Sequence, residues 1–82
     1  MPERLLGAAA KTVGLKQTLK AVEKGRARVV FVARDADARL VQPVIDGCRR
    51  QGTELVYVDS MQELGRYCQI DVGAATAAVV DE

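Results

Sequence analysis

The chain has 82 residues, of which 49% are hydrophobic and 28% are charged, and its formal net charge at pH 7 is +1. This length corresponds to one small domain, and this balance of apolar and charged residues excludes an intrinsically disordered chain. The chain has no histidine and only two cysteines, which excludes a zinc site of the usual kind, and no apolar run approaches the roughly 18 residues that span a bilayer. We therefore expect a single cytoplasmic domain over residues 1–82, with no secretory signal, membrane segment, metal or cofactor.

The charges are unevenly distributed along the chain. Residues 1–28 contain seven basic and two acidic residues, a balance of +5, whereas residues 29–82 contain five basic and nine acidic residues, a balance of −4. The net charge alone argues against a protein that holds nucleic acid by charge. The basic first third nevertheless predicts a cationic region on a mildly acidic domain.

Residues 1–28 predict two helices separated by a glycine. Pro2 suits the first turn of a helix, and apolar side chains recur at helical spacing as far as Val13. Gly14 interrupts this pattern, and a second helix is expected over residues 16–24, after which Gly25 suits the position following a helix end. The expected apolar residues of the first helix are Leu5, Leu6, Ala9 and Val13, and those of the second are Leu15, Leu19 and Val22.

The next part of the chain predicts a strand and a helix. Residues 29–33 form a continuous apolar run rich in β-branched side chains, which predicts a central strand covered on both faces. Residues 34–37 form a loop, and Pro43 predicts the start of a helix that ends at Gly52. The side chains expected to face inward from this helix are Val44, Ile45 and Cys48.

Two more strands and one more helix complete the expected fold. Residues 55–58 predict a strand, and Ser60 with Glu63 forms a capping box that predicts a helix over residues 61–68. Thr76–Val80 is the last expected strand. This alternating order predicts the α/β class, as a three-layer α-β-α sandwich with a small mixed β-sheet of about four strands.

The second predicted helix carries three lysines along one side. Lys16, Lys20 and Lys24 are four residues apart, and a solvated lysine face is the simplest interpretation of such a row. A helix that begins after Gly14, however, presents unpaired N–H groups and its positive dipole end to a phosphate. Gln17 adds a donor and an acceptor, the groups that read a base edge. Both interpretations remain open at this point.

A second candidate segment lies between the last helix and the last strand. Ile70 and Val72 either fill the edge of the core or form an exposed apolar surface for an unstacked base, the way in which single-stranded RNA is recognised. Gly73 and Ala74 have small side chains that leave the backbone accessible to a close approach. The pattern alone does not decide between the two.

Candidate catalytic groups are few. Asp35 and Asp37 follow the central strand, where carboxylates can hold Mg²⁺, but a cap on the next helix is the simpler role of Asp37. Cys48 and Cys68 have no histidine to act as a base, so we expect reduced core thiols, with disulfide pairing left open. An enzyme that uses the two aspartates is therefore the least favoured of the functional hypotheses.

Two separated segments together resemble one family. Residues 14–25, GLKQTLKAVEKG, and residues 64–75, LGRYCQIDVGAA, are similar to the RNA-gripping elements of the kink-turn-binding ribosomal proteins of the L7Ae and L30e type, and to their short bacterial homologues. The resemblance extends over essentially the whole chain. It implies an α-β-α sandwich that binds a kink-turn, an RNA duplex sharply bent at a short bulge flanked by tandem sheared G·A pairs.

The resemblance also implies which residues contact RNA. The turn before the second helix would enter the groove at the G·A pairs, and the distal loop would cover the extruded bulge nucleotide. Asp37 and Val41 align loosely with positions that contact bulge nucleotides in some members. The expected RNA-binding residues are Gly14, Leu15, Lys16, Gln17, Lys20, Lys24, Asp37, Ile70, Asp71, Val72, Gly73 and Ala74.

The chain departs from the family pattern at two places. Many archaeal and eukaryotic members have Asn-Glu where this chain has Lys16-Gln17, and a neutral Gln17 accepts hydrogen bonds from guanine more weakly than a carboxylate does. Met61 also stands where some members have a lysine. We expect a monomeric protein that binds RNA, ribosomal or regulatory, and not DNA. The alternative is a protein-interaction or regulatory domain that keeps this fold without binding RNA.

Overall fold

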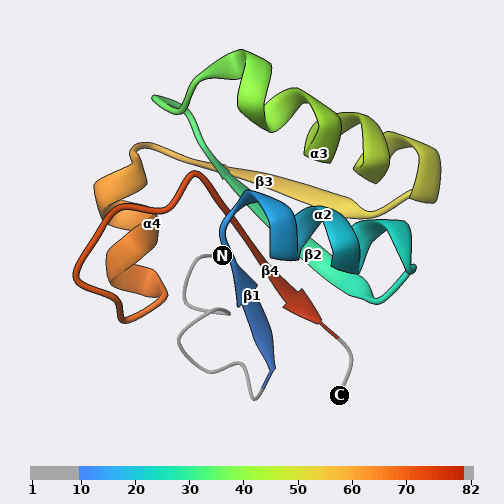
Figure 1. The fold of residues 1–82 in the computed structure, drawn as a ribbon, viewed down its shortest axis with the longest axis horizontal. Coiled ribbons are helices and arrows are strands. Elements are labelled where there is room, and N and C mark those ends of the chain that lie inside the picture. Colours follow the sequence, from blue (N-terminus) through green and yellow to red (C-terminus); the bar gives the residue numbers. More distant parts are fainter. Residues whose placement is uncertain (1–9, 81–82) are drawn as a thin grey trace.

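The structure is a computed structural model that describes residues 10–80. Within this range the chain forms four strands and three helices, as Figure 1 shows, and this confirms the α/β class with a small sheet. The elements in chain order are β1 (Lys11–Val13), α2 (Leu15–Glu23), β2 (Ala27–Ala33), α3 (Ala38–Gln51), β3 (Glu54–Val58), α4 (Met61–Tyr67) and β4 (Thr76–Val80).

The sheet is mixed and has the strand order β1-β4-β2-β3. β2 pairs parallel with β3 and antiparallel with β4, while β1 pairs antiparallel with the other side of β4. Phe31 on β2 is accordingly in register with Val56 on one side and Ala77 on the other. Residues 29–33 are all buried, so the prediction of a central strand covered on both faces is confirmed.

The sheet separates two apolar clusters, which makes the fold a three-layer sandwich. Successive β2 side chains alternate between the clusters because strand side chains point to opposite faces. Figure 1 shows α2 and α3 side by side on one face of the sheet and α4 apart from them. The cluster under α2 and α3 comprises Val22, Val30, Val32, Val41, Val44, Ile45, Cys48 and Ala78. The cluster under α4 comprises Val29, Phe31, Ala33, Val58, Leu64, Cys68, Ala74 and Ala77.

The predicted first helix is wrong at its end. Residues 11–13 form the edge strand β1, in which Lys11 pairs with Val79 and Val13 with Ala77. β4 would otherwise leave one row of backbone N–H and C=O groups unpaired, and this long-range pairing outweighs a helical spacing of apolar residues. The other residues of that predicted helix, Leu5, Leu6 and Ala9, lie outside the described residues.

The predicted start of the third helix at Pro43 is also wrong. α3 begins at Ala38, and Pro43 lies inside it. Asp37 caps the helix by accepting a hydrogen bond from the Arg39 N–H at 2.9 Å, and the extra turn buries Val41. The cap and the buried valine outweigh the hydrogen bond that a proline inside a helix cannot donate. The other expected bounds, at Gly52, Met61 and Thr76–Val80, agree with the structure.

Replacing this proline is expected to stabilise the protein. Pro43 is exposed, so Pro43→Ala removes no core packing and restores a backbone donor within α3. We expect the free energy of unfolding in urea to rise by about 1–3 kcal/mol, the range set by the proline penalty in a helix interior. The neighbouring exposed change Gln42→Ala should alter it by less than about 0.5 kcal/mol. A loss of stability in Pro43→Ala would contradict this prediction.

Candidate nucleic-acid interface

The turn before α2 is shaped by Gly14. Its φ of 99° and ψ of 165° lie in a region that side chains with a Cβ rarely adopt. Its N–H donates to the carbonyl of Thr76 at 2.8 Å, and its own carbonyl accepts from the Thr18 N–H at 3.1 Å. No side chain caps the helix, and its first turn has no acidic residue. The positive dipole end of α2 is therefore not offset by a capping side chain or by an acidic residue in its own first turn.

The side chains of α2 separate into a buried stripe and an exposed polar face. Thr18, Ala21 and Val22 are buried, and Leu15 and Leu19 are partly buried against the same cluster, which confirms the predicted apolar stripe. Leu15 therefore packs partly against the core. The exposed face is formed by Lys16, Gln17, Lys20, Glu23 and Lys24.

In the loop between α4 and β4, one apolar residue packs against the core and another is exposed, so each of the two interpretations applies to one of them. Ile70 is partly buried and packs against the cluster under α4, so it fills the edge of the core. Val72 is 71% exposed, the largest exposed fraction among the large apolar side chains of the described residues. Asp71 and Gly73 are also exposed, whereas Ala74 is buried. Val72 is thus the exposed large apolar side chain of this loop.

The end of α4 holds this loop in place. Cys68 is the C-cap residue that follows Tyr67, the last residue of the helix, and Gln69 comes next with a φ of 63°. The Ile70 N–H donates to the Gly65 carbonyl at 3.1 Å, and the Gln69 N–H donates to the Arg66 carbonyl at 3.0 Å. This pair of bonds is a Schellman motif, in which the left-handed position usually carries glycine.

A glycine at this position should stabilise the protein. Gln69 is exposed, and its left-handed conformation carries a steric cost that glycine lacks. We expect Gln69→Gly to raise the free energy of unfolding by about 0.5–1 kcal/mol in urea denaturation. Gln69→Ala keeps the Cβ and with it the strain, so it should show no such gain. A lower stability of the glycine variant than of the alanine variant would contradict this explanation.

Hydrogen bonds bring the two candidate segments to one edge of the sheet. Gly14, at the start of α2, bonds to Thr76 at the start of β4. Immediately before Thr76, the Ala75 carbonyl accepts from the Ala33 N–H at 2.9 Å and the Ala74 N–H donates to the Met61 carbonyl at 3.0 Å. The turn at residue 14 and the loop over residues 70–75 are therefore neighbours, although Gly14 and Ile70 are 56 positions apart in the sequence.

The two aspartates of the neighbouring loop have structural partners. Asp35 accepts from the Met61 N–H at 2.8 Å, which ties this loop to the start of α4. Asp37 caps α3 and also accepts from the Arg39 guanidinium at 3.1 Å, and the side-chain hydrogen bond from Arg39 lowers the pKa of this carboxyl. Among residues 10–80, no group of three His, Cys, Asp or Glu side chains could hold a metal ion. The predicted capping role of Asp37 is confirmed.

The cysteines are core residues. Cys48 and Cys68 are buried free thiols on opposite faces of the sheet. Burial raises the pKa of both, and nearby Lys11 only partly opposes this for Cys68. Because the thiolate is the nucleophilic form, a raised pKa leaves these groups inert at neutral pH.

In the described part of the chain, no helix is long and apolar enough to cross a membrane.

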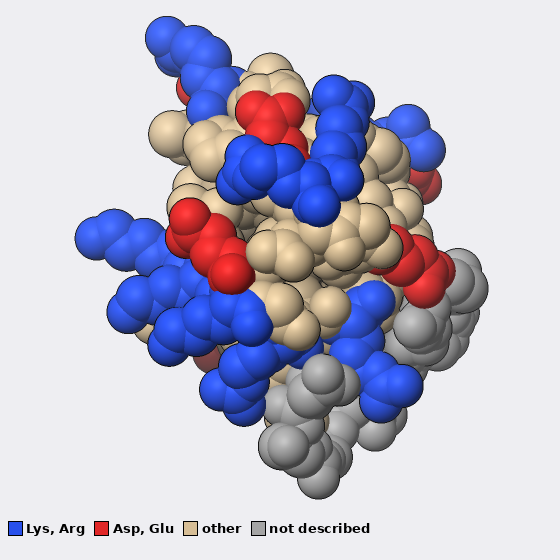
Figure 2. All heavy atoms as spheres, turned by 90° about the vertical axis from the view of Figure 1, so that its right-hand side faces the viewer, with Lys and Arg blue, Asp and Glu red and all other residues tan. Residues whose placement is uncertain are grey.

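Basic side chains dominate the surface at the ends of α2 and α3. Figure 2 shows that Lys and Arg side chains project from much of this face, with the acidic side chains lying singly between them. The lysines of α2 are exposed, and so are Arg26 and Arg28 in the turn and strand that follow. The basic residues of the predicted cationic region are thus on the surface from Lys16 to Arg28, and α3 adds Arg49 and Arg50 in its last turn.

A pocket of ≈ 230 Å³ lies beside α2, and two of its polar residues were not among the expected RNA-binding residues. Gln17, Lys20 and Lys24 line it, as expected candidates would, together with Ala21 and Val80. Thr12 and Arg26 were not candidates because they lie just outside the motif over residues 14–25, in β1 and in the α2–β2 turn. Thr12 was missed because residues 2–13 were predicted to form a helix. A prediction of a strand beside α2 would have placed Thr12 at this pocket.

The fold and this edge define a class of protein: a small α-β-α sandwich with an uncapped, lysine-lined helix start beside an apolar loop. Residues 6–82 match the ribosomal protein L7Ae/L30e/S12e/Gadd45 family. An RNA-binding protein of Caldanaerobacter subterraneus subsp. tengcongensis is 50% identical over 70 residues, 85% of each chain. The large ribosomal subunit protein eL8 of Halobacterium salinarum is 40% identical over 68 residues, 82% of this chain and 57% of that protein.

A solved structure agrees with these relatives. The 15.5kD RNA binding protein of Giardia lamblia superposes with a TM-score of 0.87 at 28% identity, covering 99% of this chain and 68% of that one. The chain therefore belongs to the ribosomal protein L7Ae/L30e/S12e/Gadd45 family, which confirms the resemblance drawn from residues 14–25 and 64–75. This is a family of ribosomal and RNA-binding proteins and not of enzymes.

Proposed function

We propose that this protein binds RNA and that it recognises a kink-turn by the edge at which Gly14 and the loop over residues 70–75 meet. The observation that carries the proposal is the hydrogen bond between Gly14 and Thr76, which joins the uncapped start of α2 to the end of the loop that contains the exposed Val72. A bent RNA offers phosphates and base edges to the first and an unstacked base to the second. The names of the relatives support RNA as the ligand.

Each part of this edge has a separate role in the proposal. Lys16 and Lys20 attract phosphates beside the N–H groups of the first turn of α2. Gln17 is exposed and reads base edges at the G·A pairs through its amide. Val72 covers the extruded nucleotide, while Ile70 and Ala74 fix the loop from beneath. The carboxylate of Asp37 is hydrogen-bonded to Arg39, so in this proposal Asp37 lies at the interface without offering a free carboxylate to the RNA.

The folded form of the RNA is selected because its bend is costly. A protein that binds only the bent form shifts the RNA toward it by the difference between its affinities for the two forms. A ribosomal or regulatory RNA in the cytoplasm is the proposed target, and a monomer is the proposed state, since one copy carries both segments of the edge.

A titration of a short kink-turn RNA tests this function. The comparison is with the same RNA whose G·A pairs are replaced by Watson–Crick pairs, at fixed near-physiological salt, with bending followed by energy transfer between the RNA ends. We expect tight binding and bending of the first RNA only. Equal, weak binding of both would leave the fold without this function and favour an interaction domain that does not bind RNA.

A further inference from the structure

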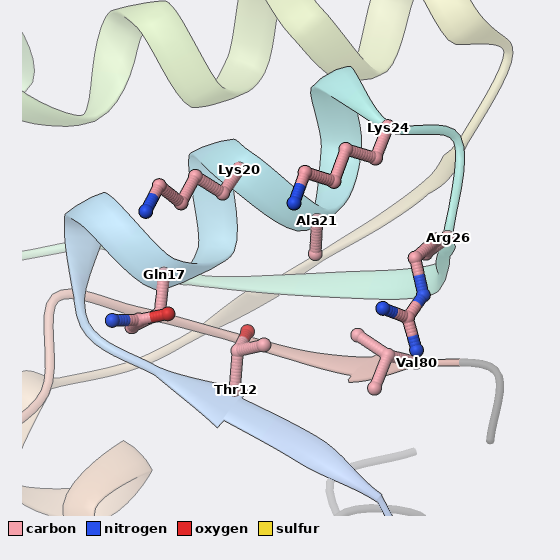
Figure 3. A pocket seen from close by; sticks show the side chains of 7 residues that line it. All are labelled: Thr12, Gln17, Lys20, Ala21, Lys24, Arg26 and Val80. Atoms are coloured by element: carbon pink, nitrogen blue, oxygen red, sulfur yellow. The ribbon is translucent and has the colours of Figure 1, made fainter.

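The pocket beside α2 has a cationic wall and a neutral floor. Lys20 and Lys24 border it from the helix, and Arg26 borders it from the turn that follows. Figure 3 shows the Arg26 side chain reaching toward Val80, with Ala21 on the helix above. None of the described residues that line the pocket is acidic. Three positively charged side chains that line one pocket attract anions to it, so the pocket is suited to an anion.

The other end of the pocket carries polar groups. Gln17 and Thr12 line it there, and Figure 3 shows them on facing elements, the start of α2 and the strand β1. The Thr12 hydroxyl is 3.0 Å from the Thr18 hydroxyl of the same helix, which fixes β1 against α2 at this point. The hydroxyl and amide groups can donate to phosphate oxygens, and the cations strengthen such bonds.

The pocket is longer than a single phosphate group. Gln17 and Lys24 are seven residues apart on α2, which corresponds to about 10 Å along the helix axis. Arg26 extends the cationic wall beyond the end of the helix. The backbone of an RNA strand is a chain of phosphates long enough to fill this length, and the pocket begins at Gln17, the residue that the proposed function places at the G·A pairs.

We propose that this pocket holds the phosphate backbone of the RNA strand that continues from the pairs contacted by Gln17, with Arg26 and Thr12 as additional RNA-binding residues. The inference rests on the proposed function and adds a direction to it, because the duplex stem then runs alongside α2 toward the α2–β2 turn. Arg26 is the residue that tests this inference best. It lies outside both segments that resemble the family's RNA-gripping elements, directly after Gly25, the last residue of the first segment.

The test compares two arginine variants that each remove one positive charge. Arg26→Gln changes the pocket, while Arg49→Gln changes an arginine in the last turn of α3 that does not line it. The affinity for kink-turn RNA is measured over a range of salt concentrations, with the stem beyond the G·A pairs shortened stepwise. Arg26→Lys keeps the charge, and thermal melting confirms that each variant is folded.

We expect Arg26→Gln to lower the slope of log affinity against log salt by about 0.7–0.9, the value of one phosphate contact. Arg49→Gln and Arg26→Lys should both keep the wild-type slope. The lower slope of Arg26→Gln should return to the wild-type value once the stem is too short to reach the α2–β2 turn. Equal slopes for the two glutamine variants, or an effect that persists with the shortest stem, would overturn the inference.

The same titrations separate this inference from the proposed function. If the wild-type protein distinguishes the kink-turn from its Watson–Crick counterpart but the two glutamine variants behave alike, the proposed function stands and the pocket assignment fails. If the wild-type protein does not distinguish the two RNAs, the proposed function fails and the pocket assignment fails with it.

Discussion

Gly65→Ala is expected to lower the free energy of unfolding by about 2–3 kcal/mol and to weaken RNA binding with it. Gly65 is buried in α4, and a Cβ at this position would lie against the Val72 carbonyl oxygen, well inside van der Waals contact. The same Cβ would be 3.1 Å from the Val72 carbonyl carbon and 3.2 Å from the Gly73 Cα. These are backbone atoms, so no side-chain rotation relieves the contact.

The direction of this effect is decided by a comparison of two magnitudes. Alanine in place of glycine within a helix contributes about 1 kcal/mol of stability on its own. Displacing a packed backbone segment costs more than that, and the displaced segment carries Val72, the apolar side chain proposed to cover the extruded nucleotide. The variant should therefore lose both stability in urea and affinity in the kink-turn titration.

A matched change on the same helix serves as the control. Gln62→Ala replaces an exposed side chain of α4 and should change stability by less than about 0.5 kcal/mol while keeping RNA affinity. If Gly65→Ala instead proved as stable as the wild-type protein and bound RNA equally, the close approach of α4 to the loop would be of no consequence for either property.

Gln17→Ala should cost about 1–3 kcal/mol of RNA binding and relax the preference for the G·A pairs. Gln17 is exposed at the start of α2 and lines the pocket, so its loss should leave the fold intact. An amide that donates and accepts at a base edge contributes specificity, whereas a lysine beside it contributes charge. The energy-transfer titration with both RNAs measures affinity and preference together.

Two further variants test this assignment. Gln17→Glu places a carboxylate, a stronger acceptor from guanine, at this position, and should sharpen the preference for the G·A pairs. Gln42→Ala removes a surface glutamine of α3 and should have no effect on binding. Wild-type binding by Gln17→Ala would show that the base-reading role belongs to another residue.

The elements that local pattern predicted well are those whose signal is contained within the element. The run at residues 29–33 is apolar on both faces, and only a central strand has that property here. The Ser60 hydroxyl accepts from the Glu63 N–H at 3.0 Å, as the capping box requires, and α4 begins at the next residue, Met61. Thr76–Val80 likewise has the predicted bounds.

The candidate site was predictable only in its separate parts. The exposed polar face of α2 follows from helical periodicity, because lysines spaced by four residues fall on one side of a helix. The division between packed Ile70 and exposed Val72 does not follow from the sequence, since both are β-branched apolar residues of one loop. The loop that contains both residues follows Gln69, whose φ of 63° is left-handed.

Residue types and spacings were sufficient for the class of fold, the buried strand, the capped helix and the lysine row, because each depends on contacts within about one turn of helix or one strand. Long-range contacts decided the rest. Pairing with β4 made a strand of residues 11–13 and placed Thr12 beside α2. The bond from Gly14 to Thr76 joined two distant segments into one surface, and no local pattern can specify a hydrogen bond between backbone groups so far apart in sequence.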